Sequence, residues 1–294
     1  MVVQVEGTAQ VDTTAQVGTA VQHAWYPVAS CGPQCIGPAR TAAGQVRMAL
    51  RGARLLVLVL MLACAAPIVW RFAPRYRGRL ARRSSRSVLA ALGVTLLVDD
   101  RRLVDGSEPE AINGLIVANH VSWVDILAVN ALHPARFVSK ADVRHWPFIG
   151  YLVASGGTLF IERERKRDAL RVVHQIAAAL QAGDIVAVFP EGTTSDGHDV
   201  LPFHANLLQA AIATAAPVQP VVLRYRDAHA AVSQAPSYVG DTSLAASLWA
   251  TVTADKLVAE VIVENALGTR HADRRALAEH LRELIVGRLK EGRA

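Results

Sequence analysis

The sequence predicts an α/β domain with a largely parallel sheet flanked by helices, preceded by an N-terminal membrane helix. From about residue 85, short apolar runs alternate with longer segments of helical periodicity, a pattern typical of parallel strands joined by helices. Hydrophobic residues make up 52% of the 294 residues, which is ample for a buried core. Before this domain, an uncharged run from Leu55 to Trp70 is flanked by arginines.

By composition the chain divides into three regions. Residues 1–47 are rich in Ala, Val, Gln, Thr and Gly without a sustained period, so we expect a poorly ordered extension. Met48 also has the features of a natural start, which would place this extension upstream of the protein. Residues 48–84 combine the apolar helix with an arginine-rich flank, and residues 85–294 form one α/β domain without an internal repeat or linker.

The apolar run at 55–70 would form a helix about 24 Å long, just short of a hydrocarbon core of roughly 30 Å. It could cross a bilayer with the help of snorkelling arginines, or dip into one leaflet. The arginines that follow it predict a polybasic surface against anionic lipids, with the α/β domain on the cytoplasmic face. Two alternatives are a buried core helix and a lipoprotein signal processed at Cys64, although the apolar run continues beyond that cysteine.

The charge of the chain indicates which partners it binds, and its cysteine content indicates which chemistry it lacks. The net charge of +6 and the pI of about 9.6 favour an anionic partner. Aromatic residues make up only 5%, which argues against stacking on single-stranded nucleic acid, so an anionic membrane surface is expected and no nucleic acid. The last of the three cysteines is Cys64, which excludes a disulfide framework and a cysteine nucleophile in the α/β domain.

The α/β domain is expected to begin with the strand TLLVD (95–99) and to continue through strands at 114–119, 136–140, 158–162, 184–189, 218–225 and 260–264. Each is a short apolar run between turn-forming or charged residues. Helical patterns cover 123–132, 142–155, 167–181, 204–215, 243–256 and 272–290. Because ligands of parallel sheets bind beyond the carboxyl ends of the strands, the segments after residues 119, 160 and 189 are candidate sites.

The first of these segments has the sequence NHVSWVD (119–125). The strand ends at Asn119, and Ser122 is a good N-cap for a helix starting at the next residue, so the chain turns between His120 and Asp125. A carboxylate bonded to one imidazole nitrogen fixes the tautomer, and the other nitrogen can then remove a proton from a hydroxyl. We therefore predict His120 as a general base oriented by Asp125. The alternatives are that Asp125 only completes a capping box with Ser122, or that Ser122 is a nucleophile.

The second and third segments supply groups for an anion. In GTLFIERERKRD, Arg163 lies nearest the sheet edge and could present its planar guanidinium to a phosphate. In VFPEGTTSDG, the backbone amides and hydroxyls around Gly192 and Thr193 suit an oxyanion or phosphate, although the loop lacks the lysine of a Walker sequence. Glu191 is expected to accept hydrogen bonds from hydroxyls or to pair with a cation such as Arg163. The alternative is a plain turn.

Together these segments resemble the motifs of the glycerolipid acyltransferase family, whose best-known members are the 1-acyl-sn-glycerol-3-phosphate acyltransferases. The residues that carry the resemblance are Asn119, His120 and Asp125 for NHxxxxD; Gly157, Phe160, Ile161, Glu162 and Arg163 for GxxFIDR; Phe189, Pro190, Glu191, Gly192 and Thr193 for FPEGT; and Pro220 on a late apolar strand. The similarity covers roughly residues 85–225. Glu162 departs from the more usual aspartate and places its carboxylate one methylene further out.

The resemblance implies a glycerol-3-phosphate acyltransferase-like fold and an O-acyltransferase of the bacterial inner membrane. His120, oriented by Asp125, would take the proton of the free hydroxyl of 1-acyl-glycerol-3-phosphate. That oxygen would attack the thioester of acyl-CoA or acyl carrier protein and give phosphatidic acid, with no cofactor and no covalent acyl-enzyme. The residues expected to hold the polar head of the acceptor are Arg163, Glu191, Gly192, Thr193 and, as a helper, Lys140.

Several alternatives stay open. The stretch EGTTSDGHDVLPF also resembles the branch with lyso-ornithine lipid acyltransferases, which would change the acceptor. From other classes come a non-catalytic lipid-binding membrane protein and a basic DNA-associated protein. The segment 145–157 is either part of the acyl path or an ordinary core helix. No metal is expected, because the spacing of the clustered His198, His204, Asp196 and Asp199 matches no common site.

Overall fold

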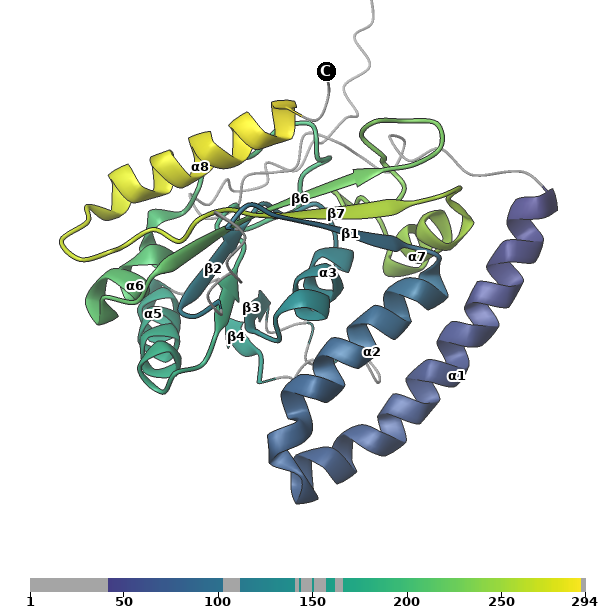
Figure 1. The fold of residues 1–294 in the computed structure, drawn as a ribbon, viewed down its shortest axis with the longest axis horizontal. Coiled ribbons are helices and arrows are strands. Elements are labelled where there is room, and N and C mark those ends of the chain that lie inside the picture. Colours follow the sequence, from purple (N-terminus) through teal and green to yellow (C-terminus); the bar gives the residue numbers. More distant parts are fainter. Residues whose placement is uncertain are drawn as a thin grey trace, which may run out of the picture.

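The computed structural model describes residues 42–102, 112–140, 143, 150, 157–161 and 166–291, and it confirms the predicted fold class (Figure 1). The strands are β1 (Thr95–Asp100), β2 (Leu115–Ala118), β3 (Arg136–Lys140), β4 (Leu159–Ile161), β5 (Val186–Val188), β6 (Val218–Arg226) and β7 (Val258–Val263). The helices are α1 (Ala42–Phe72), α2 (Arg77–Leu92), α3 (Val124–Leu132), α5 (Lys166–Gln181), α6 (Gln209–Thr214), α7 (Leu244–Thr253) and α8 (Arg274–Glu291), with short 3₁₀ turns η2 (Pro74–Tyr76) and η4 (Ala205–Leu208).

The strands form one sheet of seven in the order β1-β7-β6-β2-β5-β3-β4. All neighbours in this order are parallel except β6 and β7, which run antiparallel. Because β2, β5 and β6 run in the same direction, their carboxyl ends meet at one edge of the sheet. The segments after residues 119 and 189 are therefore brought together, as predicted from the rule for parallel sheets.

Helices cover both faces at the centre of the sheet, which explains why β2 and β5 are apolar and buried along their whole length, whereas β1 is largely exposed. Along β2, Leu115 and Val117 contribute to the core shared with α5, α6 and α8, whereas Ile116 and Ala118 pack toward α3. Figure 1 shows α8 on one side of the sheet and α3 with α2 on the other. A second cluster on the α3 side joins α2, α7 and Tyr225 of β6.

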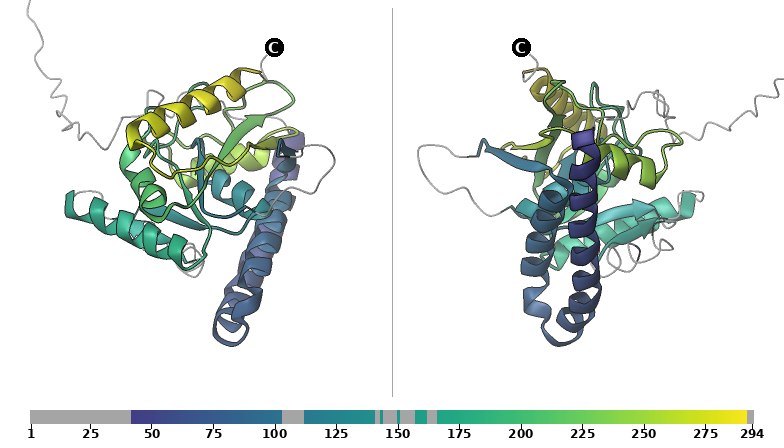
Figure 2. Two further views of the ribbon diagram at one scale, coloured as in Figure 1. Left: turned by 60° about the vertical axis from the view of Figure 1, so that its left-hand side comes forward. Right: turned by 90° about the vertical axis from the view of Figure 1, so that its right-hand side faces the viewer.

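The N-terminal helix α1 is longer than the predicted run at 55–70, and most of its surface is exposed. Residues Ala49–Val69 have a mean hydropathy of 2.3 and are 6% buried, so by length and composition this helix could cross a membrane. The alternative of a buried core helix is therefore wrong. Figure 2 shows α1 and α2 side by side as a hairpin that projects away from the sheet. Near its start, Arg51 donates to the carbonyls of Val252 and Ala254 at the end of α7, at 2.6 and 3.1 Å.

Some boundaries differ from the expectation. α1 begins at Ala42, inside the region predicted to be poorly ordered, and the boundary predicted at residue 85 falls within α2. The helix predicted at 204–215 is divided into η4 and α6. The predicted helix at 142–155, except residues 143 and 150, and the predicted site residue Arg163 lie outside the described residues.

Candidate active site

The predicted contact between His120 and Asp125 is present. His120 follows β2 directly, the chain turns, and Asp125 lies in the first turn of α3. His120 Nδ1 and Asp125 Oδ2 are 2.8 Å apart. The helix begins at Val124, one residue later than predicted, and the Ser122 hydroxyl accepts a hydrogen bond from the Val124 amide at 3.2 Å. Ser122 is fully buried beneath this turn. A nucleophile must be accessible to the acyl group, so the burial of Ser122 argues against that role.

The Asp125 carboxylate is fully buried and is held by four hydrogen bonds. Besides the imidazole, Oδ2 accepts from the amides of Val121 and Ser122 at 2.7 and 2.9 Å. Oδ1 accepts from the Tyr225 hydroxyl at 2.6 Å. The bond from the Ser122 amide is the one a capping box would make, so Asp125 fixes both the helix start and the imidazole. These donors offset the cost of burying the charge and leave the carboxylate one orientation.

The imidazole of His120 is fixed on several sides. Its side chain is 19% exposed, and its ring stacks on Phe189 with centroids 4.0 Å apart, while Phe189 also stacks on Phe137. Its backbone amide donates to Glu191 Oε1 at 2.6 Å, and its carbonyl accepts from the Ser195 amide at 2.8 Å. Within the part of the chain described, Nε2 makes no hydrogen bond. A nitrogen held in this way can accept a proton from a substrate hydroxyl.

Glu191 lies behind the imidazole and not at the surface of the site. Its side chain is fully buried, and Oε1 and Oε2 accept from the backbone amides of His120 and Leu201, at 2.6 and 2.8 Å. Burial raises the pKa of Glu191 to about 8, against the lowering effect of these two donors. The expected bonds from hydroxyls are replaced by bonds from backbone amides. The expected pairing with Arg163 involves a residue outside the described ones.

The rest of the third segment, after Glu191, forms a loop held by hydrogen bonds. The Gly192 amide donates to the Phe189 carbonyl at 3.1 Å, which is the turn considered as the alternative, and Gly192 has a left-handed φ of 72°. Thr193 is partly exposed beside it, and the Thr194 hydroxyl donates to the Tyr238 carbonyl. Lys140 ends β3, next to β4 and β5, and nothing is described of its side chain.

In the group considered as a metal site, the two aspartates accept hydrogen bonds from backbone amides of their own loop. Asp196 accepts from the His198 amide at 2.9 Å, and Asp199 accepts from the Val200 amide at 2.7 Å. In the described residues, no three His, Cys, Asp or Glu side chains are grouped so that they could hold a metal ion.

Two further residues arrange this site: Asn119, which the sequence identified as the strand end and a motif residue without a role, and Tyr225, which sequence reasoning missed. Asn119 is buried, and its amide group pairs with the main chain of Leu223, donating at 2.9 Å and accepting at 2.8 Å. This bond pair extends the β2–β6 pairing into the loop. Tyr225, two residues further along β6, therefore faces Asp125. Strand alternation puts Leu223 and Tyr225 on one face, but only the pairing of β6 with β2 brings that face to the site.

Comparison with known proteins agrees with this geometry. A family model described as Acyltransferase matches residues 103–224. A 1-acyl-sn-glycerol-3-phosphate acyltransferase of Neisseria meningitidis serogroup B is 39% identical over 214 residues, which is 72% of this chain and 81% of that protein. A lyso-ornithine lipid O-acyltransferase of Pseudomonas aeruginosa is 35% identical over 246 residues, 82% and 93% of the two chains.

The crystal structure of the 1-acyl-sn-glycerophosphate (LPA) acyltransferase PlsC from Thermotoga maritima covers 83% of this chain and 98% of its own, with a TM-score of 0.52. At 20% identity this likeness shows the fold alone. The resemblance carried by the NHxxxxD and FPEGT residues is confirmed by the family match and by relatives that span most of the chain. The chain belongs to the acyltransferase family that includes the 1-acyl-sn-glycerol-3-phosphate acyltransferases.

Proposed function

We propose that the protein is a membrane-bound O-acyltransferase that moves a fatty acyl group from acyl-CoA or acyl carrier protein to the free hydroxyl of 1-acyl-glycerol-3-phosphate, giving phosphatidic acid. The observation that carries the proposal is the 2.8 Å contact between His120 Nδ1 and Asp125 Oδ2. The relative at 39% identity supports this acceptor. The relative at 35% identity covers more of the chain and keeps lyso-ornithine lipid as the second candidate, with the same chemistry.

In the proposed reaction, Asp125 keeps the proton of His120 on Nδ1 and stabilises the imidazolium that forms. Nε2 takes the proton of the acceptor hydroxyl as its oxygen bonds to the thioester carbonyl carbon. The carbon–sulfur bond then breaks and the thiolate leaves. Because an ordinary thiol has a pKa of about 8.5, this leaving group needs little help from an acid. The proton on Nε2 returns to the thiolate or to solvent, and no acyl-enzyme forms.

The polar head of the acceptor is proposed to lie over the loop after β5. Gly192 and Thr193 are partly exposed there. Thr193 offers a hydroxyl, whereas the Gly192 amide already donates to the Phe189 carbonyl, so Gly192 is proposed only to let the head lie close to its backbone. Arg163 and Lys140 are the proposed cationic partners of a phosphate. Glu191 is assigned a different role from the one expected, because both of its oxygens are engaged by backbone amides. It positions the backbone of His120.

The acceptor is tested by acyl transfer from labelled acyl-CoA or acyl carrier protein in membranes that contain the protein. 1-Acyl-glycerol-3-phosphate and lyso-ornithine lipid are offered in parallel, with His120→Ala membranes as the blank. We expect labelled phosphatidic acid that is absent from the blank. Product from the ornithine lipid alone would move the enzyme to the second candidate. No His120-dependent product from either acceptor would refute the proposed function and favour the non-catalytic lipid-binding protein.

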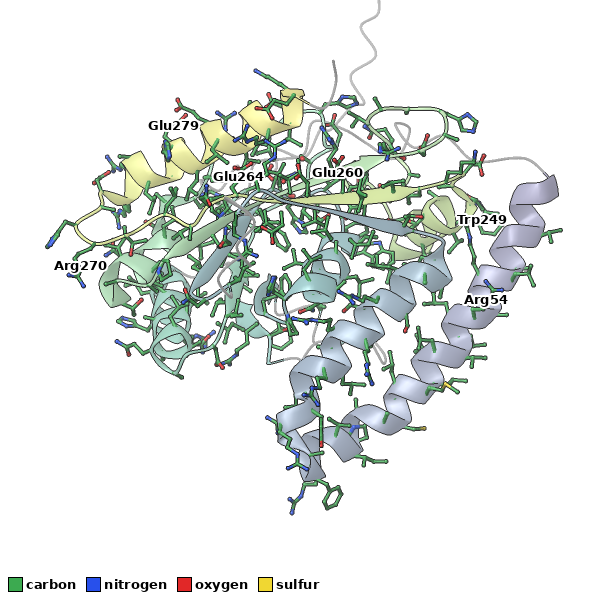
Figure 3. All side chains as sticks on the ribbon, viewed as in Figure 1. Arg54, Trp249, Glu260, Glu264, Arg270 and Glu279 are labelled. Carbon is green, nitrogen blue, oxygen red and sulfur yellow. The ribbon has the colours of Figure 1, made fainter. Side chains whose placement is uncertain are left out.

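We further propose that α1 lies in the membrane interface instead of crossing the bilayer, on the cytoplasmic face of the inner membrane. Arg51 near its start bonds to the end of α7, and α2, which follows α1, returns to pack on α3. A spanning α1 would draw the arginine-rich start of α2 through hydrocarbon, at a cost of about 3 kcal/mol or more per arginine. In Figure 3 the side chains along the outer side of α1 are mainly carbon.

Two arginines on this outer side should weaken membrane binding. Leu56 and Leu60 are 61% and 54% exposed and lie one turn apart. We expect Leu56→Arg with Leu60→Arg to lower the fraction of protein that floats with vesicles of anionic phospholipid about 10-fold or more, because each buried charge is costly. Leu97→Arg with Leu170→Arg adds the same charge at exposed leucines of β1 and α5 and should float normally. Equal flotation of the two variants would contradict the placement of α1.

A further inference from the structure

Tyr225 reaches the site from a distant part of the sequence. It lies on β6, one residue beyond the segment matched by the family model, and 100 positions after Asp125. Its ring is buried in the cluster that also contains Val121 and Val124, the residues on either side of the turn between His120 and α3. This packing fixes the ring and therefore the position of its hydroxyl. The hydroxyl donates a hydrogen bond to Asp125 Oδ1 at 2.6 Å.

The hydroxyl completes the hydrogen bonding of a buried charge. Three donors converge on Asp125 Oδ2, namely His120 Nδ1 and the amides of Val121 and Ser122. Among the described residues, Tyr225 is the donor to Oδ1. A buried carboxylate oxygen without a donor costs free energy, and it can also turn toward another donor. The Tyr225 hydroxyl therefore holds the Oδ1 end of the carboxylate, as the other three donors hold the Oδ2 end.

The phenol is well suited to remain a donor. Burial, followed by the charge of Asp125 and the hydrogen bond to it, raises the pKa of Tyr225 well above its usual value of 10. Glu191, from the loop after β5, is a further titratable side chain near Asp125, and Arg282 of α8 acts on Glu191 in turn. Tyr225 is thus protonated at any pH at which the enzyme would work.

We infer that Tyr225 is a positioning residue for acyl transfer: its hydroxyl holds the Asp125 carboxylate in the orientation that keeps the proton of His120 on Nδ1 and presents Nε2 to the acceptor hydroxyl. The inference rests on the proposed function for its kinetic readout. Tyr225 touches no reacting atom. It acts through Asp125, as Asp125 acts through His120.

The test is Tyr225→Phe, which removes the hydroxyl and keeps the ring. We expect kcat to fall roughly 10- to 100-fold with little change in KM, which corresponds to losing one hydrogen bond to a charged group. The low-pH limb of the kcat profile, where the general base becomes protonated, should move to higher pH. The reason is that a carboxylate with one donor fewer pairs more strongly with a protonated imidazole.

Thr269→Val is the matched control. Thr269 is buried, and its hydroxyl donates to the carbonyls of Ala211 and Ala216, near the opposite end of β6. Losing that hydroxyl should lower the thermal midpoint without moving the low-pH limb. If Tyr225→Phe behaves in the same way, with an unchanged limb, its hydroxyl is merely structural and the inference is overturned.

A second readout does not depend on turnover. In the ¹⁵N spectrum of histidine-labelled protein in detergent, the His120 signals are assigned by their absence in His120→Ala. We expect the Nδ1–H tautomer in the wild type and a mixture of tautomers in Tyr225→Phe. A single unchanged tautomer in the variant would overturn the inference. If the wild type formed no product from either acceptor, the proposed function would fail, and the tautomers would still decide the role of Tyr225.

Discussion

Replacing His120 by alanine is expected to lower kcat for acyl transfer about 10²- to 10⁴-fold, the range for loss of a positioned general base. The fold should survive, because the side chain is partly exposed and its backbone bonds to Glu191 and Ser195 do not involve the imidazole. The loss should therefore appear in kcat of folded protein, although losing one donor to Asp125 should lower the thermal midpoint. The measurement is initial rates with saturating acceptor for the wild type and the variant.

Two further variants sharpen this result. His174→Ala, at an exposed position on α5, removes an imidazole away from the site and should leave kcat unchanged. Asp125→Asn acts through His120, so adding it to His120→Ala should cost little more than His120→Ala alone. A His120→Ala enzyme that turned over either acceptor at nearly the wild-type rate would contradict the assignment of the general base.

Replacing Glu191 by glutamine is expected to change how the stability of the protein depends on pH. The pKa of Glu191 is about 8 in the fold, against about 4.5 for an exposed glutamate. Between these values the folded protein holds a proton that the unfolded chain has lost, so wild-type stability falls as pH rises through this window. The slope is at most about 1.4 kcal/mol per pH unit. Glutamine cannot ionise, but its NH2 group cannot accept from a backbone amide as the second carboxyl oxygen does.

The effect of Glu191→Gln is measured as a comparison of thermal midpoints in detergent at pH 5, 6, 7 and 8. We expect Glu191→Gln to be less stable than the wild type near pH 5, because it loses one of the two amide bonds, and this difference should narrow toward pH 8. Glu279→Gln changes an exposed carboxylate on α8 and should follow the wild type at every pH (Figure 3). A constant difference between Glu191→Gln and the wild type would mean that Glu191 is ionised in the fold across this range.

The same variant separates the two roles considered for Glu191. If Glu191 bound the polar head of the acceptor, Glu191→Gln would raise the KM for the acceptor. If it positions the backbone of His120, as its bonds to the amides of His120 and Leu201 indicate, kcat should change while that KM stays nearly constant. A buried residue of the FPEGT segment would then shape the catalytic loop from behind.

Local sequence determined much of this protein. The strand predicted for RFVSK has its observed bounds, and the helices predicted at 167–181 and 272–290 differ from α5 and α8 by one or two residues at their ends. Periodicity succeeds here because burial of one face repeats along the element itself. The turn between His120 and Asp125 likewise follows from residues within NHVSWVD. The uncharged run before the α/β domain identified the exposed apolar helix.

Tertiary structure alone decided the contacts that hold the site. Asn119 pairs with Leu223, Tyr225 reaches Asp125, and Glu191 receives the amide of His120, across 104, 100 and 71 positions of the chain. Each depends on β2 lying between β5 and β6, an order that no local pattern encodes. Helix α2 is not predicted from the sequence, because arginines dominate its start. Its buried face is defined by packing on α3, which is distant in the sequence. Residue types fixed the chemistry available, and the pairing of distant strands fixed its geometry, because a buried hydrogen bond needs both partners in place.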